Sequence, residues 1–169
     1  NTPNLMYLGS ISKVRELERL VYMGLEIKFV GSGDAVERLR SLGAQVDNPC
    51  SSKEVPFILS QADIGLLHLP NRSEWRGASP LKVSEYAAAG MCVISSDVSG
   101  LSEFKHEEWL TLVPLGDDSG FLSATNDLIQ SGMDEIRRKG ELAKKWAIQN
   151  RDWSVCVNDL EKYIIDSLN

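Results

Sequence analysis

The sequence predicts a single α/β domain: a doubly wound parallel sheet of about six strands, followed by a helical C-terminus. Short apolar runs alternate with longer stretches whose apolar residues repeat with helical spacing. Strands separated by single helices favour βαβ units, and therefore a parallel sheet covered on both faces. The 169 residues suffice for one domain with a full core, so we treat residues 1–169 as one unit.

The first half of the chain predicts four strands with helices between them. Gly9 ends the first strand, a Gly31-Ser32-Gly33 turn ends the second, and Gly43 stops the second helix. The predicted strands are 5–8, 27–30, 44–46 and 64–69, and the predicted helices are 14–23, 36–42 and 55–62.

The second half opens with a polar loop at 70–78 and a helix that runs to Gly90. We expect Ser79 to cap this helix and Pro80 to take its first position, where no amide hydrogen is needed. Two strands follow, at 92–95 and 109–113, and the rest is predicted helical in three pieces. Asp117 and Asp118 are expected at a helix N-terminus, and Trp109, Trp146 and Trp153 at packing positions.

Composition excludes several classes of function. A formal charge of −6 argues against a general nucleic-acid binder, and no apolar stretch approaches the roughly 18 residues of a membrane helix. The first residues show no signal peptide, so a cytoplasmic protein is expected. Three widely spaced cysteines indicate reduced thiols, and neither a metal site nor a cofactor is predicted.

The strongest functional signal is the helix start around Lys82. Ligands of open parallel sheets bind beyond the carboxyl ends of the strands, where this helix begins. Free amides and the helix dipole favour an anion there, and Lys82 adds a full positive charge. Glu85 lies one turn deeper on the same face, within reach of sugar hydroxyls attached to a bound phosphate. The pattern indicates a nucleotide-diphosphate site, although the pair alone could be a surface ion pair.

Several segments carry a family resemblance in their order and spacing. They are Met6 to Arg15, Phe29 to Asp34, Val55 to Ile64, Ser79 to Asp97, Gly100 to Glu103, and Trp153-Ser154. Together they resemble the C-terminal, donor-binding half of retaining sugar-nucleotide glycosyltransferases of the GT-B architecture, the group 1 type.

The resemblance implies a Rossmann-like domain whose N-terminal acceptor domain is absent from this chain. It implies a nucleotide-diphosphate sugar, with UDP or GDP, as donor substrate. It also implies transfer with retention in polysaccharide or glycolipid synthesis. Peripheral membrane association of a full-length protein is compatible with it. The donor half alone is expected to bind nucleotide but to transfer little sugar.

The resemblance also implies roles for individual residues. Lys82 and Arg15 match the positions that stabilise the diphosphate leaving group, and Glu85 matches the ribose-binding glutamate. Lys13 is a candidate to replace the arginine that the family often has at the position of Ser10. The other nucleotide-binding positions are Ser79, Pro80, Leu81, Gly9, Gly31, Gly33, Asn48 and Pro49.

The chain departs from the family at the donor-sugar contact. The first of the family's two glutamates, which usually contacts the sugar, falls on Gly77. Glu74 is a candidate replacement from the same loop, and Arg72 or Arg76 could face the diphosphate. Trp75 is the one tryptophan suspected of ligand contact. No catalytic histidine is assigned, because no carboxylate partner is evident for His68 or His106.

Two alternatives remain open at this point. A nucleotide-sugar epimerase of related architecture would also bind a UDP-sugar, but it needs acid/base groups that this half does not display. A non-catalytic nucleotide or partner module would explain the missing first glutamate at Gly77.

Overall fold

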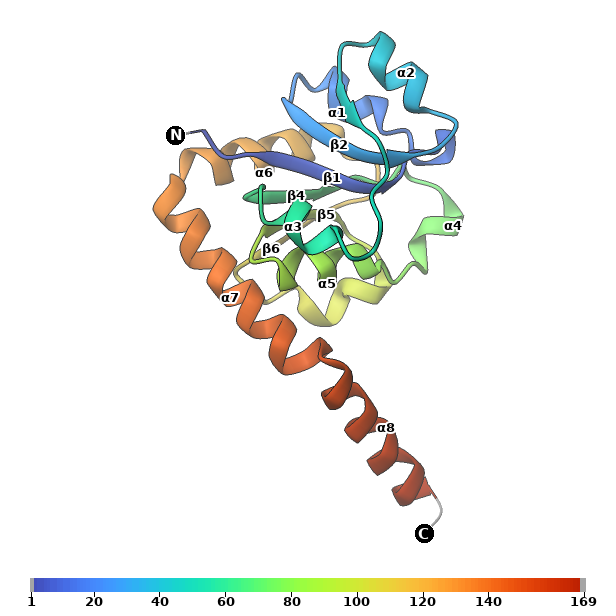
Figure 1. Cartoon of the computed structure of the whole chain (residues 1–169), viewed down its shortest axis with the longest axis vertical. Coiled ribbons are helices and arrows are strands. Elements are labelled where there is room, and N and C mark those ends of the chain that lie inside the picture. The colour runs from blue at the N-terminus through green and yellow to red at the C-terminus, as the bar shows by residue number, and fades with distance from the viewer. Residues whose placement is uncertain (1, 168–169) are drawn as a thin grey trace.

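A six-stranded, entirely parallel sheet forms the centre of the domain, as predicted (Figure 1). The computed structural model describes residues 2–167. The strand order is β3-β2-β1-β4-β5-β6. From β1 the chain builds the sheet toward one edge, ending at β3, and it then returns to the centre and builds from β4 toward the other edge, ending at β6. The strands are β1 (Leu5–Ser10), β2 (Ile27–Ser32), β3 (Gln45–Asp47), β4 (Ile64–Leu67), β5 (Cys92–Ser96) and β6 (Leu110–Val113).

Helices cover both faces of the sheet. In Figure 1, α1, α2 and α6 lie on one face, and α3, α5 and α7 lie on the other. This placement buries β1, β4 and β5, whose apolar runs supply much of the core. The helices are α1 (Glu18–Tyr22), α2 (Val36–Ser41), α3 (Val55–Leu59), α4 (Ser73–Arg76), α5 (Leu81–Ala88), α6 (Asp118–Gln130), α7 (Met133–Arg151) and α8 (Trp153–Ser167).

The expected helix at 14–23 is wrong in its first half. The structure has a 3-10 turn, η1 (Lys13–Arg15), and then α1, separated by Glu16 in the left-handed conformation. Val14 is 48% exposed and contributes nothing to the core at its predicted apolar position. The left-handed residue breaks the helical path, so apolar spacing alone overextended the helix.

The start of α5 also differs from the prediction. Pro80 is the N-cap residue itself, and no side chain among residues 2–167 caps the helix, so Ser79 does not have the expected role. The Ser79 Cβ lies close against Gly100 instead, while the Gly100 amide donates to the Ala78 carbonyl at 3.2 Å. Gly100 belongs to a second 3-10 segment, η2 (Ser99–Phe104), which the sequence pattern did not indicate. The expected loop at 70–78 contains the short helix α4.

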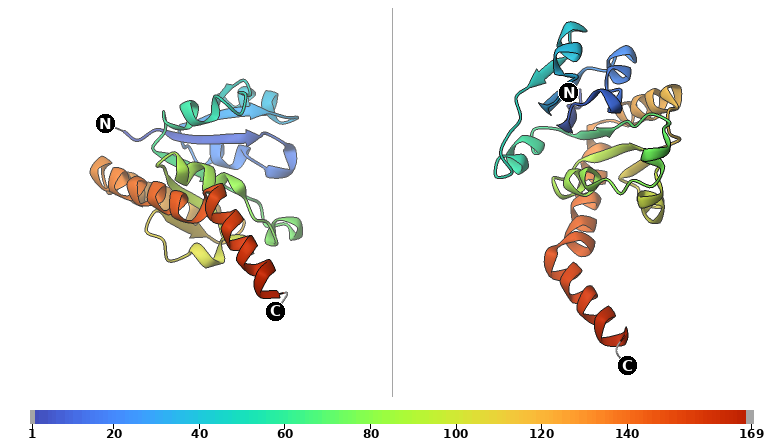
Figure 2. Two further views of the ribbon diagram at one scale, coloured as in Figure 1. Left: turned by 60° about the horizontal axis from the view of Figure 1, so that its bottom comes forward. Right: turned by 90° about the vertical axis from the view of Figure 1, so that its right-hand side faces the viewer.

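The C-terminal helices differ sharply in burial. Trp109 and Trp146 are buried and in contact, with ring centroids 4.9 Å apart, as expected of packing residues. Trp153 is 84% exposed, so its predicted packing position is wrong. α8 has no buried residue and projects away from the sheet and its covering helices (Figures 1 and 2). None of the helices described between residues 2 and 167 is long and apolar enough to cross a membrane.

Candidate nucleotide site

Lys82 and Glu85 lie together beside the carboxyl end of β1. A Cβ added to Gly9 would lie 3.0 Å from Lys82 Cε, so the lysine stem rests against this glycine. Lys82 Nζ donates to Glu85 Oε2 at 2.7 Å. The two side chains keep 29% and 40% exposure, so both the ammonium and the carboxylate remain accessible to a ligand.

The position of α5 follows from one buried tyrosine. Tyr86 packs its ring over Gly65 of β4, where any side chain would overlap with the ring. The Tyr86 hydroxyl accepts a hydrogen bond from the Leu8 amide of β1 at 3.0 Å. Burial raises the pKa of this hydroxyl, so it stays neutral. Tyr86 therefore ties α5 to β1 and places Lys82 against Gly9.

The loops after β1 and β2 interlock at the same edge of the sheet. Gly9 and Gly31 are register partners, and a Cβ on Gly31 would overlap with the Gly9 carbonyl. A Cβ on Gly33 would likewise overlap with the Ile11 carbonyl. The Lys13 amide donates to the Asp34 carboxylate at 2.8 Å, which fixes the start of η1. Gly31 and Gly33 therefore act through close backbone packing that positions the loop between Gly9 and Arg15.

Arg15 is held at this edge by an aromatic ring. Its guanidinium carbon lies 5.0 Å from the centre of the Trp75 ring, a cation–π contact between η1 and α4. Burial raises the pKa of Tyr7 to about 12, and the positive charge of Arg15 partly opposes this increase. The Tyr7 hydroxyl donates to the Ser10 carbonyl at 2.7 Å and closes the end of β1. Trp75 is thus in contact with a predicted site residue.

A chain of ion pairs beside Arg15 was missed by sequence reasoning. Glu16 accepts hydrogen bonds from Arg72, with Nε at 3.1 Å, and from Arg19 Nε at 2.9 Å. The bond from Arg72 holds the pKa of the Glu16 carboxyl below its usual value, and Arg19 adds to the effect. Arg72 therefore pairs with Glu16 in this structure, whereas the sequence suggested that it could face the diphosphate. The only sequence signal was the presence of these charges, since their pairing depends on the fold.

The same chain of contacts reaches His68 and corrects the prediction made for it. Arg19 Nη1 donates to Asp118 at 3.0 Å, and His68 Nε2 lies 2.8 Å from Asp118 Oδ1. His68 therefore has a carboxylate partner, 50 residues away in the sequence. Asp117 caps α6 by accepting from the Gly120 amide at 2.9 Å, as the acidic pair predicted.

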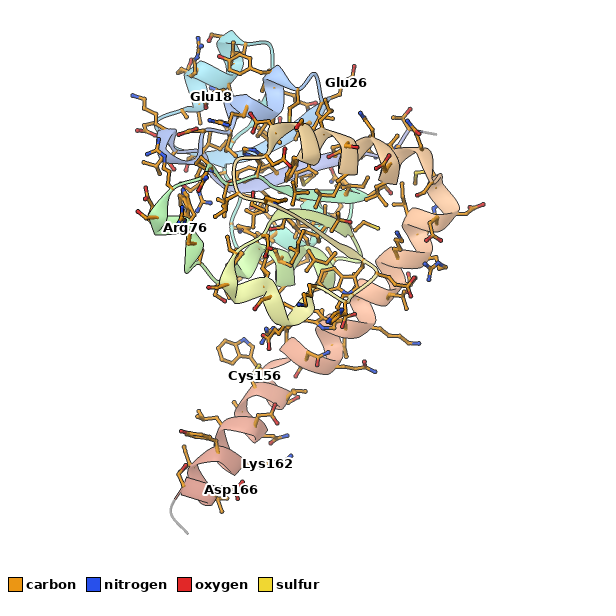
Figure 3. All side chains as sticks on the ribbon, turned by 180° about the vertical axis from the view of Figure 1, so that it is seen from behind. Glu18, Glu26, Arg76, Cys156, Lys162 and Asp166 are labelled. Carbon is orange, nitrogen blue, oxygen red and sulfur yellow. The ribbon has the colours of Figure 1, made fainter. Side chains whose placement is uncertain are left out.

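The three candidate donor-sugar residues lie on or just after α4. Glu74 is exposed, with a carboxylate oxygen 4.0 Å from an Arg72 nitrogen. Arg76 projects from the edge of the domain, and its Nη2 donates to Asn71 at 3.4 Å (Figure 3). Gly77 ends α4, and a Cβ there would meet open space. None of these contacts involves Lys82 or Glu85.

Asn48 and Pro49 lie farther from the rest of the site. Both are exposed and follow β3, which β2 separates from β1 in the sheet. Leu81 is 77% exposed at the start of α5, so its amide lies at an accessible helix end. The structure thus groups Gly9, Arg15, Lys82, Glu85 and the start of α5, with Asn48 and Pro49 at the flank.

A hollow of about 940 Å³ lies elsewhere, at the amino ends of β1, β2 and β3. Its lining includes Leu5, Ile27 and Gln45 and none of the predicted site residues. The carboxyl edge is instead where cations, free helix amides and a carboxylate meet, which suits an anion joined to a sugar. Among residues 2–167, no group of three or more histidine, cysteine, aspartate or glutamate side chains is arranged to hold a metal ion.

Solved structures share this fold. The chain is 18% identical to sucrose-phosphate synthase from Thermosynechococcus elongatus, with a TM-score of 0.76, covering 99% of this chain and 46% of that one. It is 14% identical to HepE from Anabaena in complex with UDP and glucose, with a TM-score of 0.77, covering 99% and 49%. The catalytic domain of cholesterol-α-glucosyltransferase from Helicobacter pylori is 16% identical, with a TM-score of 0.67, covering 88% and 99%.

The chain spans about half the length of the first two of these proteins. Comparison with curated protein sequences finds no significant match. The family profile of glycosyl transferases group 1 matches residues 4–131, which include all six strands and the start of α5. Because this match covers more than half of its residues, the chain belongs to the glycosyl transferases group 1 family.

Proposed function

We propose that this chain is the donor-binding half of a glycosyltransferase that transfers a sugar from a nucleoside diphosphate to an acceptor with retention. The observation that carries the proposal is the placement of Lys82 against Gly9, paired with Glu85, at the start of α5. An accessible cation beside free helix amides suits a diphosphate, and the carboxylate behind it suits the two ribose hydroxyls.

The chemistry assigned to this half is stabilisation of the leaving group. As the bond between the sugar and the diphosphate breaks, negative charge accumulates on the departing phosphate oxygens. Lys82, Arg15 and the first amides of α5 supply positive charge and donors that are already oriented there. The acceptor would be held by a second half.

UDP is the first nucleotide to test, because HepE has been solved with UDP and with UDP-glucose. Calorimetric titration of the chain with UDP, GDP, ADP and TDP should give saturable binding for one base in preference to the others. Binding of none of the four would contradict the proposal.

Two variants separate the phosphate role from the ribose role. Lys82→Ala should weaken both UDP and inorganic pyrophosphate by about 10- to 100-fold, because it removes a charge-assisted hydrogen bond. Glu85→Ala should weaken UDP but not pyrophosphate, because it removes a diol acceptor and frees Lys82 from its ion pair. Lys144→Ala, an exposed lysine on α7, is the matched control and should bind both ligands as the wild-type chain does.

Transfer itself is tested on a protein in which this half is joined to an acceptor-binding half. The double variant Lys82→Ala, Glu85→Ala should lose sugar transfer and donor-sugar hydrolysis. Activity that survives both changes would contradict the assignment. Conversion of a UDP-sugar to its epimer, without transfer, would favour the epimerase alternative instead.

A further inference from the structure

Two consecutive side chains at the end of η1 reach across to α4. Arg15 lies over the Trp75 ring, with 5.0 Å from guanidinium carbon to ring centre. Glu16 Oε1 accepts from both Nε and Nη2 of Arg72, at 3.1 and 2.5 Å. Arg72 is the N-cap residue of α4, and Trp75 lies within α4. The segment that follows β4 therefore contacts the end of η1 twice, through the Arg15–Trp75 contact and the Glu16–Arg72 ion pair.

Glu16 is unusual in its backbone as well as its contacts. It has φ 51 and ψ 41, and it is the only non-glycine residue between positions 2 and 167 with a positive φ. Its amide closes η1 by donating to the Lys13 carbonyl at 3.1 Å, and its carbonyl accepts from the Arg19 amide at 3.1 Å. A non-glycine residue persists in this conformation when the surrounding contacts fix it, and such residues cluster at functional sites.

The contacts that fix Glu16 are anchored in the core. Its second carboxylate oxygen accepts from Arg19, which also binds Asp118 at the start of α6. Asp118 in turn binds His68, which is 1% exposed just after β4. The Glu16 side chain is itself 22% exposed, so a largely covered carboxylate joins Arg19 of α1 to Arg72 at the start of α4.

We propose that Glu16 is a positioning residue of the donor site. It holds the arginine before it, Arg15, in place toward the diphosphate and keeps Arg72 and α4 folded against η1. The inference rests on the proposed function, because it is that function that gives Arg15 its role at the diphosphate. Glu16 acts through its neighbours and does not itself touch the nucleotide.

The test compares UDP with UMP, because UMP lacks the β-phosphate. Glu16→Gln removes the negative charge that binds Arg19 and Arg72. It should weaken UDP by about 5- to 10-fold and leave UMP within about twofold, a size typical of coupling between contacting residues. Glu18→Gln, two positions later on α1, is the control and should match the wild-type chain for both ligands.

A second variant separates positioning from folding. Glu16→Gly also removes the carboxylate but relieves the left-handed backbone, so its Tm should stay near that of the wild-type chain. Its preference for UDP over UMP should nevertheless fall as in Glu16→Gln. A purely structural role predicts a lower Tm with an unchanged preference, which would overturn the inference.

A double-mutant cycle identifies the partner through which Glu16 acts. In the Arg15→Ala background, Glu16→Gln should cause little further loss of UDP affinity. An equal loss with and without Arg15 would also overturn the inference, as would an unchanged preference in Glu16→Gln. If the wild-type chain binds none of the four nucleoside diphosphates, the proposed function itself fails. If the wild-type chain binds UDP and the Glu16 variants bind UDP and UMP as it does, only the positioning role of Glu16 fails.

Discussion

At the scale of single residues, His68 carries the clearest consequence for stability. Its Nε2 faces Asp118, its ring packs edge-on against Phe121, and its Nδ1 is buried with no partner among residues 2–167. Burial lowers the pKa of His68, although hydrogen bonding and attraction from Asp118 oppose the change. The folded protein therefore favours the neutral ring, because a proton on Nδ1 would find no acceptor.

The sign of the pH dependence follows from the lowered pKa. The unfolded chain binds a proton at His68 from about pH 6.5 downward, before the folded chain does, so stability falls as the pH is lowered. His68→Gln should cost about 1 kcal/mol at pH 7.5, and the difference from the wild-type chain should narrow by pH 5.5. Denaturant unfolding of both chains at the two pH values measures this. A gap that widens at pH 5.5 would contradict the depressed pKa.

Residue contacts were the part least accessible from sequence. Lys82 and Glu85 are three positions apart on one helix, so their pairing followed from helical spacing. Glu16 and Arg72 are separated by 56 positions, and His68 and Asp118 by 50. Such pairs can be predicted only when the strand order is known, and the sequence pattern did not provide that order.

At the scale of elements, apolar periodicity predicted well wherever an element is regular and buried. All six strands lie within a few residues of the predicted runs; β1, β4 and β5 are largely buried in the parallel sheet, while β3 at one edge is only half-buried. Apolar periodicity failed where the backbone departs from regular geometry, at left-handed Glu16, at the start of α5 and in η2. Turn and cap geometry depends on tertiary contacts such as that between Ser79 and Gly100.

The contact between α5 and α7 gives an element-scale prediction. Gly140 of α7 is buried, and a Cβ there would overlap with the carbonyl oxygen of Gly90, just after α5. Gly140→Ala should therefore push the two helices apart at a cost of about 1–3 kcal/mol, offset in part by the better helix propensity of alanine. Thermal unfolding should show a Tm lower by about 2–8 °C.

The matched control for this change lies one residue away. Glu141→Ala on the exposed face of α7 should leave the Tm within about 2 °C of the wild-type value. A Gly140→Ala chain as stable as the wild type would show that the helices can separate there at no cost.

At the scale of the whole molecule, α8 stands apart from the domain. Its apolar residues Trp153, Val157, Leu160 and Ile164 are spaced by four, three and four positions, so they share one helix face. They are between 47% and 84% exposed. Figure 3 shows Cys156, Lys162 and Asp166 on the same helix, away from the sheet. The core is complete without this helix, because α8 contributes no residue to it.

Removal of α8 by truncation after Asp152 should therefore leave the fold intact. Regions with few buried contacts contribute little to global stability, so the Tm should change by less than about 2 °C. Sedimentation should also show less self-association at high concentration, because the exposed apolar face is gone. Trp146→Ala, which removes a buried ring of α7, is the contrasting variant and should lower the Tm by about 6–20 °C. A truncated chain that loses as much stability as Trp146→Ala would show that α8 packs against the domain in solution.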